Sequence, residues 1–183
     1  MYPSFYTNFP PATSTKSRSR SRLLNREVQS AKIQLADNEP AKIHDGGLKI
    51  EKINEVLRFL EDSKVFYVAT VDGDRPRVRP FSGIHVFEGK LYMPTSNKKK
   101  VFAQMMENPH VEISGMAHGK WIRVEGEIAV DHRLEARKPM LDHYGEALTR
   151  MYSLDDGKFE VVCLNNAVAT IYSFGAEPIV IEL

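Results

Sequence analysis

Cysteine is nearly absent from this chain of 183 residues, which holds only Cys163. A disulfide framework and a cysteine-based zinc site are therefore excluded, and a lone thiol favours a reducing compartment, so we expect a cytoplasmic protein. No apolar run approaches the roughly 18–20 residues that a membrane helix needs, which excludes a spanning segment. The six histidines form no HxxxH or HxH pair, so no metal site is expected.

An excess of one charge is also missing overall, because 25 basic and 24 acidic residues nearly cancel. The charges are unevenly distributed along the chain. Residues 1–34 hold six basic residues and one acidic residue, a net charge of +5, and residues 35–183 carry −4. A negatively charged body repels phosphate backbones, so we do not expect nucleic acid as its partner.

Residues 1–47 lack any helical or strand periodicity and are rich in Pro, Ser, Thr and Arg. Such a segment cannot bury enough apolar surface to offset its ordering entropy, so we predict a disordered basic tail or extension. Two other interpretations stay open: an organelle transit peptide, and an SRSRSR tract that binds RNA or phosphate. The folded domain is expected over residues 48–183.

That domain has the pattern of short strands with a few amphipathic helices. Helices are predicted over 48–62, 97–107, 133–141 and 146–151. Strands are predicted over 65–71, 75–80, 84–87, 90–94, 111–116, 120–130, 159–164, 167–174 and 179–181, with Asn165-Asn166 as the turn of a hairpin. Because strand follows strand without crossover helices, a doubly wound sheet is disfavoured. A mainly β (α+β) fold is predicted, a small antiparallel barrel with helices outside it.

The segment RPRVRP over 75–80 is the most informative stretch for function. Alternate residues of a strand share one face, so Arg75, Arg77 and Arg79 should stand side by side. One interpretation is a solvated edge strand, which Pro76 and Pro80 favour. The other is an anion site, because arginine offers planar and permanently charged forks to phosphate or to an anionic ring.

A second basic segment, PTSNKKK over 94–100, lies between a predicted strand and a predicted helix. The start of a helix offers backbone N–H groups and a favourable dipole to an anion. Ser96 or Asn97 would also be reasonable N-caps, and a lysine run often simply faces water. Together with the arginine strand, the segment favours phosphate binding.

Four stretches in this order resemble the pyridoxamine 5′-phosphate oxidase-like family of FMN-binding split barrels. They are KINEVLRFLED, FYVATVDGDRPRVRPF, GKLYMPTSNKKKVFAQMMENPHVEIS and GKWIRVEGEIAVD. The resemblance covers about residues 50–183 and implies a six-stranded antiparallel split barrel. It also implies a homodimer with two flavins at the interface and a small-molecule substrate.

The resemblance also implies the cofactor-binding residues. The flavin ring and phosphate would contact Arg77, Val78, Arg79 and Pro80. The phosphate would also contact Thr95, Ser96, Lys99 and Lys100. Gln104 and Trp121 would approach the cofactor, Trp121 either from its own subunit or from the partner. No catalytic side chain is implied. Members that oxidise pyridoxamine phosphate carry a C-terminal Arg, and none follows Arg150, which argues against vitamin B6 oxidation.

The expected function is therefore an FMN-dependent oxidoreductase that transfers hydride between a reduced donor and a small molecule. The wider family includes flavin reductases, nitroimidazole-type reductases, users of the deazaflavin F420 and haem binders. F420 and haem remain alternative cofactors, and a non-catalytic flavin or haem carrier or sensor remains the alternative function.

Overall fold

A single antiparallel sheet organises the domain in the computed structural model, which describes residues 45–183. The prediction of a disordered tail falls on residues outside this range, except for 45–47, which form the start of a helix. The strands are β1 (Phe66–Asp72), β2 (Arg75–Phe81), β3 (His85–Phe87), β4 (Lys90–Ser96), β5 (His110–Ala117), β6 (Lys120–Val130), β7 (Phe159–Ser173) and β8 (Ile179–Glu182). The helices are α2 (Asp45–Asp62), α3 (Lys100–Glu107), α4 (Leu134–Tyr144) and α5 (Glu146–Thr149).

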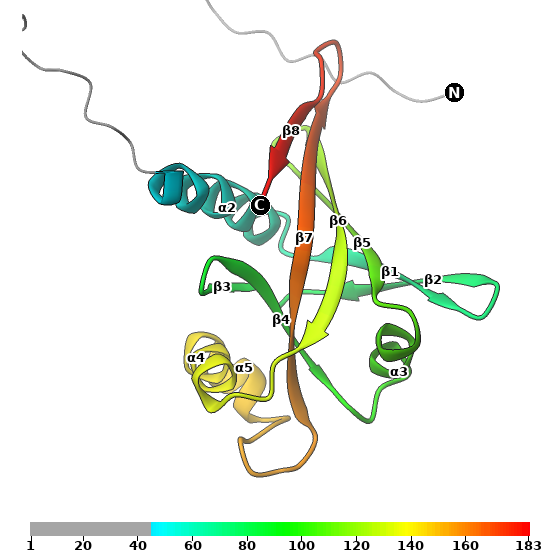
Figure 1. The fold of residues 1–183 in the computed structure, drawn as a ribbon, viewed down its shortest axis with the longest axis vertical. Coiled ribbons are helices and arrows are strands. Elements are labelled where there is room, and N and C mark those ends of the chain that lie inside the picture. Colours follow the sequence, from blue (N-terminus) through cyan, green and yellow to red (C-terminus); the bar gives the residue numbers. More distant parts are fainter. Residues whose placement is uncertain (1–44) are drawn as a thin grey trace, which may run out of the picture. The chain divides into compact units, whose positions relative to one another are not determined.

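The strands follow the order β2-β1-β5-β6-β7-β4-β3, and β8 pairs with β7 (Figure 1). The predicted mainly antiparallel fold with flanking helices is confirmed, and eight strands build its sheet. No helix of residues 45–183 has both the length and the apolar character needed to cross a bilayer. The two edge strands of the sheet are β2 and β3, and the candidate site lies between β2 and the end of β4.

The main core fills one side of the sheet. Residues that face each other across paired strands point to the same side, so the register defines rows of side chains. One row consists of Arg79, Val68, Ile113, Val124, Ala169 and Ile181. Its last five members are at most 4% exposed, so a single arginine ends an apolar row. Helix α2 covers this core with Ile53, Val56 and Leu60, as its spacing predicts.

A second, smaller core lies under α4 and α5, beside the lower half of β7 in Figure 1. It is bordered by an ion-pair network. The hydroxyl of Tyr92 donates to Asp131, which also accepts from Arg133, and Arg133 reaches Glu88. The hydrogen bond from Arg133 holds the pKa of Asp131 well below its usual range, and burial with the bond to Asp131 raises the pKa of Tyr92. The network ties the β3–β4 turn to the segment before α4.

The predicted hairpin at Asn165-Asn166 is wrong, because residues 159–173 form one continuous strand. Two steps along β6, from Glu125 to Glu127, face three steps along β7, from Val168 to Asn165. The extra residue is taken up by a bulge in which Asn166 has a positive φ of 50°. The same tolerance of asparagine for left-handed backbone that suggests a turn also permits a bulge. The unbroken strand pairs with β4 at one end and with β8 at the other.

Candidate functional site

The three arginines of β2 share one face, as predicted, but they differ in their partners. β2 is an edge strand that pairs only with β1. Arg77 Nε donates to Asp72 Oδ2 at 2.8 Å, and Arg75 Nε lies 3.8 Å from Asp74 Oδ1. Arg79 has no carboxylate within 4.0 Å among residues 45–183. Arg79 therefore differs from Arg75 and Arg77, because only the latter two have acidic neighbours.

Arg79 is half-buried and is held by neutral oxygen atoms of β1, β2 and α3. Its guanidinium donates to Thr70 Oγ1 at 2.7 Å and to Gln104 Oε1 at 2.6 Å. Burial, with a smaller contribution from the neighbouring Arg77, lowers the pKa of Arg79 from its ordinary value. An arginine keeps its proton at neutral pH all the same, so a positive charge is fixed at this edge.

The phosphate segment differs from its prediction in where the helix begins. β4 runs through Thr95 and Ser96, which pair with β7, so α3 begins at Lys100 and not at Asn97. Neither Ser96 nor Asn97 is the N-cap; the cap is Lys99, which provides no side-chain hydrogen bond. The Ser96 hydroxyl instead accepts a hydrogen bond from the backbone N–H of Lys98. The first N–H groups of α3 are thus left without a side-chain cap.

Thr95 has an unusual environment for a polar residue. Its side chain is fully buried, and its Oγ1 atom has no hydrogen-bond partner among the described residues. A buried hydroxyl without a partner costs about 1–3 kcal/mol. An unpaired donor or acceptor of this kind in the segment predicted to hold phosphate fits a site whose ligand completes the hydrogen bonding.

A cavity of about 350 Å³ lies between β2, the end of β4 and the start of α3. Its charged lining residues are Arg79 and Lys99, with no carboxylate. The Lys99 ammonium lies 5.7 Å from the centroid of the Tyr152 ring, which also lines the cavity. The remaining walls come from β2 and the loop after it, the start of β1, the end of β4, α3 and the α5 region: Val65, Pro80, Phe81, Ser82, Gly83, Pro94, Val101, Leu148 and Met151. The cavity suits an anion with an apolar part.

The structure brings only some of the predicted cofactor-binding residues to this cavity. Arg79, Pro80 and Lys99 line it, and Gln104 contacts Arg79. Arg77 and Val78 lie on exposed parts of β2, and Lys100 is exposed at the first turn of α3. Trp121 lies on β6, where its ring stacks on Tyr172 with centroids 5.4 Å apart, and it does not line the cavity.

Two residues of the site were not predicted from the sequence: Thr70, which contacts Arg79, and Tyr152, which lines the cavity. Thr70 is 2% exposed and is the one aliphatic hydroxyl in the apolar run VFYVATV, and this polar side chain in an apolar run was the signal that could have indicated it. Tyr152 follows α5 in a stretch with no motif, so nothing in the sequence indicated its proximity to Lys99.

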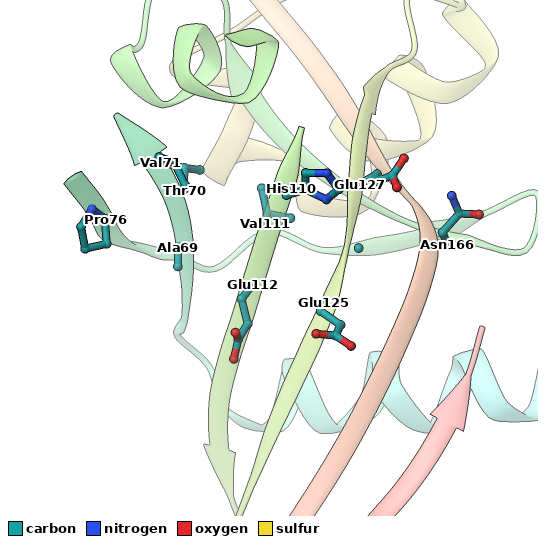
Figure 2. Close-up of a pocket in the computed structure, with 11 residues that line it drawn as sticks. Ala69, Thr70, Val71, Pro76, His110, Val111, Glu112, Glu125, Glu127 and Asn166 are labelled. Atoms are coloured by element: carbon teal, nitrogen blue, oxygen red, sulfur yellow. The ribbon is translucent and has the colours of Figure 1, made fainter. Parts of the chain in front are cut away.

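A larger cavity of about 460 Å³ lies over β1, β5 and β6, and none of the predicted site residues lines it. Its lining includes three glutamates, 112, 125 and 127, with His110 and no Lys or Arg. Figure 2 shows Glu112 and Glu125 next to each other on neighbouring strands, with His110 and Glu127 further along these strands, above them in the view. The Glu112 carboxylate is paired with Arg123. This acidic lining repels phosphate, so the larger cavity is not the candidate anion site.

The model of the pyridoxamine 5′-phosphate oxidase family matches residues 53–172, which is more than half of the chain. The chain belongs to the pyridoxamine 5′-phosphate oxidase family. The match includes the arginine strand, the phosphate segment and Trp121. The resemblance that the sequence motifs indicated is therefore confirmed.

Several solved structures are similar to this chain in fold. A NimC/NimA family protein from Clostridium acetobutylicum is 44% identical over 76% of this chain and 98% of its own, with a TM-score of 0.72. General stress protein 26 from Bacillus anthracis is 20% identical over 72% and 97% of the two chains, with a TM-score of 0.54. A haem-binding protein from Mycobacterium smegmatis is 16% identical over 73% and 57%, with a TM-score of 0.57. The comparison with curated proteins gives no match.

Proposed function

We propose that this family member is a homodimeric FMN-binding oxidoreductase acting on a small molecule in the cytoplasm. The observation that carries the proposal is the cavity whose charged lining consists of Arg79 and Lys99, without a carboxylate, at the uncapped start of α3. A flavin phosphate needs a cradle of fixed positive charge and hydrogen-bond donors. The buried free thiol of Cys163 agrees with a reducing compartment.

The lining of the cavity and the neighbouring residues of the 94–100 segment, of which only Pro94 and Lys99 line it, fit a flavin phosphate chemically. Arg79 supplies a fixed fork, and Lys99 and Lys100 supply flexible point charges. The backbone N–H groups at the start of α3 add donors, and the Thr95 hydroxyl would gain the partner that it lacks. Ser96 would act by shaping this turn through its bond with Lys98. These groups outweigh the negative charge of the body, because no acidic side chain lines the cavity.

The flavin ring would lie along β2, against Arg77, Val78 and Pro80. In one subunit taken alone this strand is exposed, and Val78 for example is 63% exposed. The side of the sheet away from the main core also exposes Tyr67 and Met116 at 51% and 67%, beside the Trp121–Tyr172 stack. An apolar face of this kind marks an interaction surface. We propose that a second copy covers it and contributes Trp121 to the flavin site.

Bound FMN would supply hydride transfer through its N5 atom, between a reduced donor and the substrate. The chain itself would bind and orient the cofactor and exclude water from one side of it. The positive charge of the arginine strand would favour the anionic reduced flavin. No side chain near the cavity stands out as an acid or base, so we assign none.

The site assignment is tested by comparing Arg79→Ala with Arg75→Ala. Both changes remove one arginine from the same face of β2, but only Arg79 lines the cavity. Fluorescence titration should show that Arg79→Ala weakens FMN binding at least 10-fold, in line with about 1.5–3 kcal/mol for a charged hydrogen bond. Arg75→Ala should stay within threefold of the parent protein. Equal effects of the two changes would overturn the assignment.

Consumption of NAD(P)H separates an oxidoreductase from a carrier. The FMN-loaded protein should oxidise the nicotinamide with an added electron acceptor, whereas a carrier or sensor would retain its cofactor without turnover. Preferential binding of F420 or haem over FMN would replace the cofactor in this proposal.

A further inference from the structure

The hydrogen bonds around Arg79 all end on uncharged oxygen atoms. Nη1 donates to Thr70 Oγ1 at 2.7 Å and to the backbone oxygens of Val68 and Arg77, each at 3.2 Å. Nη2 donates to Gln104 Oε1 at 2.6 Å. These contacts fix the guanidinium in place while leaving its charge without a counter-ion in residues 45–183.

Thr70 and Gln104 are arranged so that each hydrogen bond has a defined direction. A guanidinium only donates, so the Gln104 amide must turn its oxygen, and not its nitrogen, towards Arg79. Thr70 Oγ1 accepts from Arg79 and donates its own hydrogen to Gln104 Oε1 at 2.8 Å. The three side chains thus form a closed triangle that connects β2, β1 and α3.

The position of Gln104 is one that a carboxylate could occupy. Gln104 is 7% exposed and Thr70 is 2% exposed, so this side of Arg79 is shielded from water. A glutamate has the same shape as glutamine and would pair with the half-buried arginine, which is the usual way to hold such a charge. Glutamine keeps the geometry of that pair and omits the negative charge.

We infer that Gln104, with Thr70, is a positioning residue whose neutrality keeps the charge of Arg79 available to an anion in the neighbouring cavity. The inference rests on the proposed function, since the anion is there the phosphate of a flavin. It assigns to Gln104 an indirect role through Arg79, in place of the direct cofactor contact that the family resemblance implied.

The substitution Gln104→Glu tests this role because it preserves the shape of the side chain. A carboxylate at the same place would neutralise Arg79 and repel the phosphate. The loss of one charged hydrogen bond to the ligand corresponds to an affinity decrease of roughly 30-fold. Riboflavin has the same ring but no phosphate, so its affinity should stay within threefold.

The experiment measures FMN and riboflavin dissociation constants by fluorescence titration of the full chain. Met106→Glu is the matched control, because it adds a carboxylate to the exposed side of the same helix, where Met106 is 46% exposed. We expect Gln104→Glu to weaken FMN binding selectively and to unfold no more easily than the parent protein. We expect Met106→Glu to change neither the FMN affinity nor the riboflavin affinity by more than threefold. If Gln104→Glu does not fold, Thr70→Val, which removes one acceptor from Arg79, should weaken FMN binding about three- to tenfold with riboflavin unchanged.

The possible results are distinguishable. An unchanged ratio of FMN to riboflavin affinity in Gln104→Glu, while the parent protein binds FMN, overturns the inference and leaves the proposed function intact. A parent protein that binds no FMN overturns the proposed function instead. In that case inorganic phosphate is the probe: a rise in Tm with phosphate that Gln104→Glu loses and Met106→Glu retains supports the inference, and any other pattern overturns it.

Discussion

The unpaired hydroxyl of Thr95 leads to a specific prediction about Thr95→Val. Valine has nearly the same shape and strand preference but replaces the hydroxyl by a methyl group. Thr95 is fully buried and its Oγ1 lacks a partner, so the substitution removes a desolvation penalty of about 1–3 kcal/mol. We expect the free energy of unfolding to rise by about 1–2 kcal/mol, which is roughly 3–6 °C in Tm for a domain of this size.

The same substitution should weaken cofactor binding. If the Thr95 hydroxyl donates to the flavin phosphate, its loss should lower FMN affinity about 10-fold and leave riboflavin affinity unchanged. Stability is measured by urea unfolding without ligand, and affinity by fluorescence titration. Thr170→Val is the control, because Thr170 lies half-buried on the same strand β7 but far along it from Glu160, the residue that pairs with Thr95. A decrease in unfolding free energy for Thr95→Val would refute the reasoning, and a gain without any change in FMN affinity would remove Thr95 from the site.

Three further predictions concern the stability of the domain. Tyr144→Phe should lower the free energy of unfolding by about 2 kcal/mol in urea titrations, because its hydroxyl pairs with both the N–H and the C=O of buried Ile84, at 2.7 Å each. Gly126→Ala should lower it by about 1–3 kcal/mol, since a Cβ would lie 2.8 Å from the Asn165 oxygen at the bulge; a neutral result would show that the bulge can move. Burial, and to a smaller extent the neighbouring His143, lowers the pKa of His85 below its ordinary 6.5. The unfolded chain therefore binds more protons than the folded chain as the pH falls below 6.5. The free energy of unfolding should therefore fall as the pH falls from 6.5 towards the lowered pKa, and His85→Gln should flatten that part of the profile.

Local patterns in the sequence predicted the parts of the fold that depend on neighbouring residues. The alternation of Arg75, Arg77 and Arg79 predicted their common face, and Pro76 and Pro80 predicted an edge strand, both of which the structure confirms. These features follow from the two-residue period of a strand and from the missing N–H of proline, so no long-range information was required.

Other features depended on partners that are distant in the sequence. The Asn165-Asn166 pair is read as a turn in isolation, and only its pairing with β6 makes it a bulge. Helix α3 begins at Lys100, and not at the predicted Asn97, because β4 stays paired with β7 through Ser96. The contact of Thr70 with Gln104 spans 34 residues, so the triangle around Arg79 was not visible in any motif.

The central claim, that the chain binds FMN through its phosphate, is tested most directly on the protein as purified. Its absorption spectrum is recorded, and the compound released on denaturation is identified by mass spectrometry. We predict flavin absorption bands, a released mass equal to that of FMN, and, after removal of the cofactor, binding of FMN at least 10-fold tighter than binding of riboflavin, as expected for one charged phosphate contact. A Soret band, or a colourless protein that binds FMN and riboflavin equally or not at all, would contradict the account.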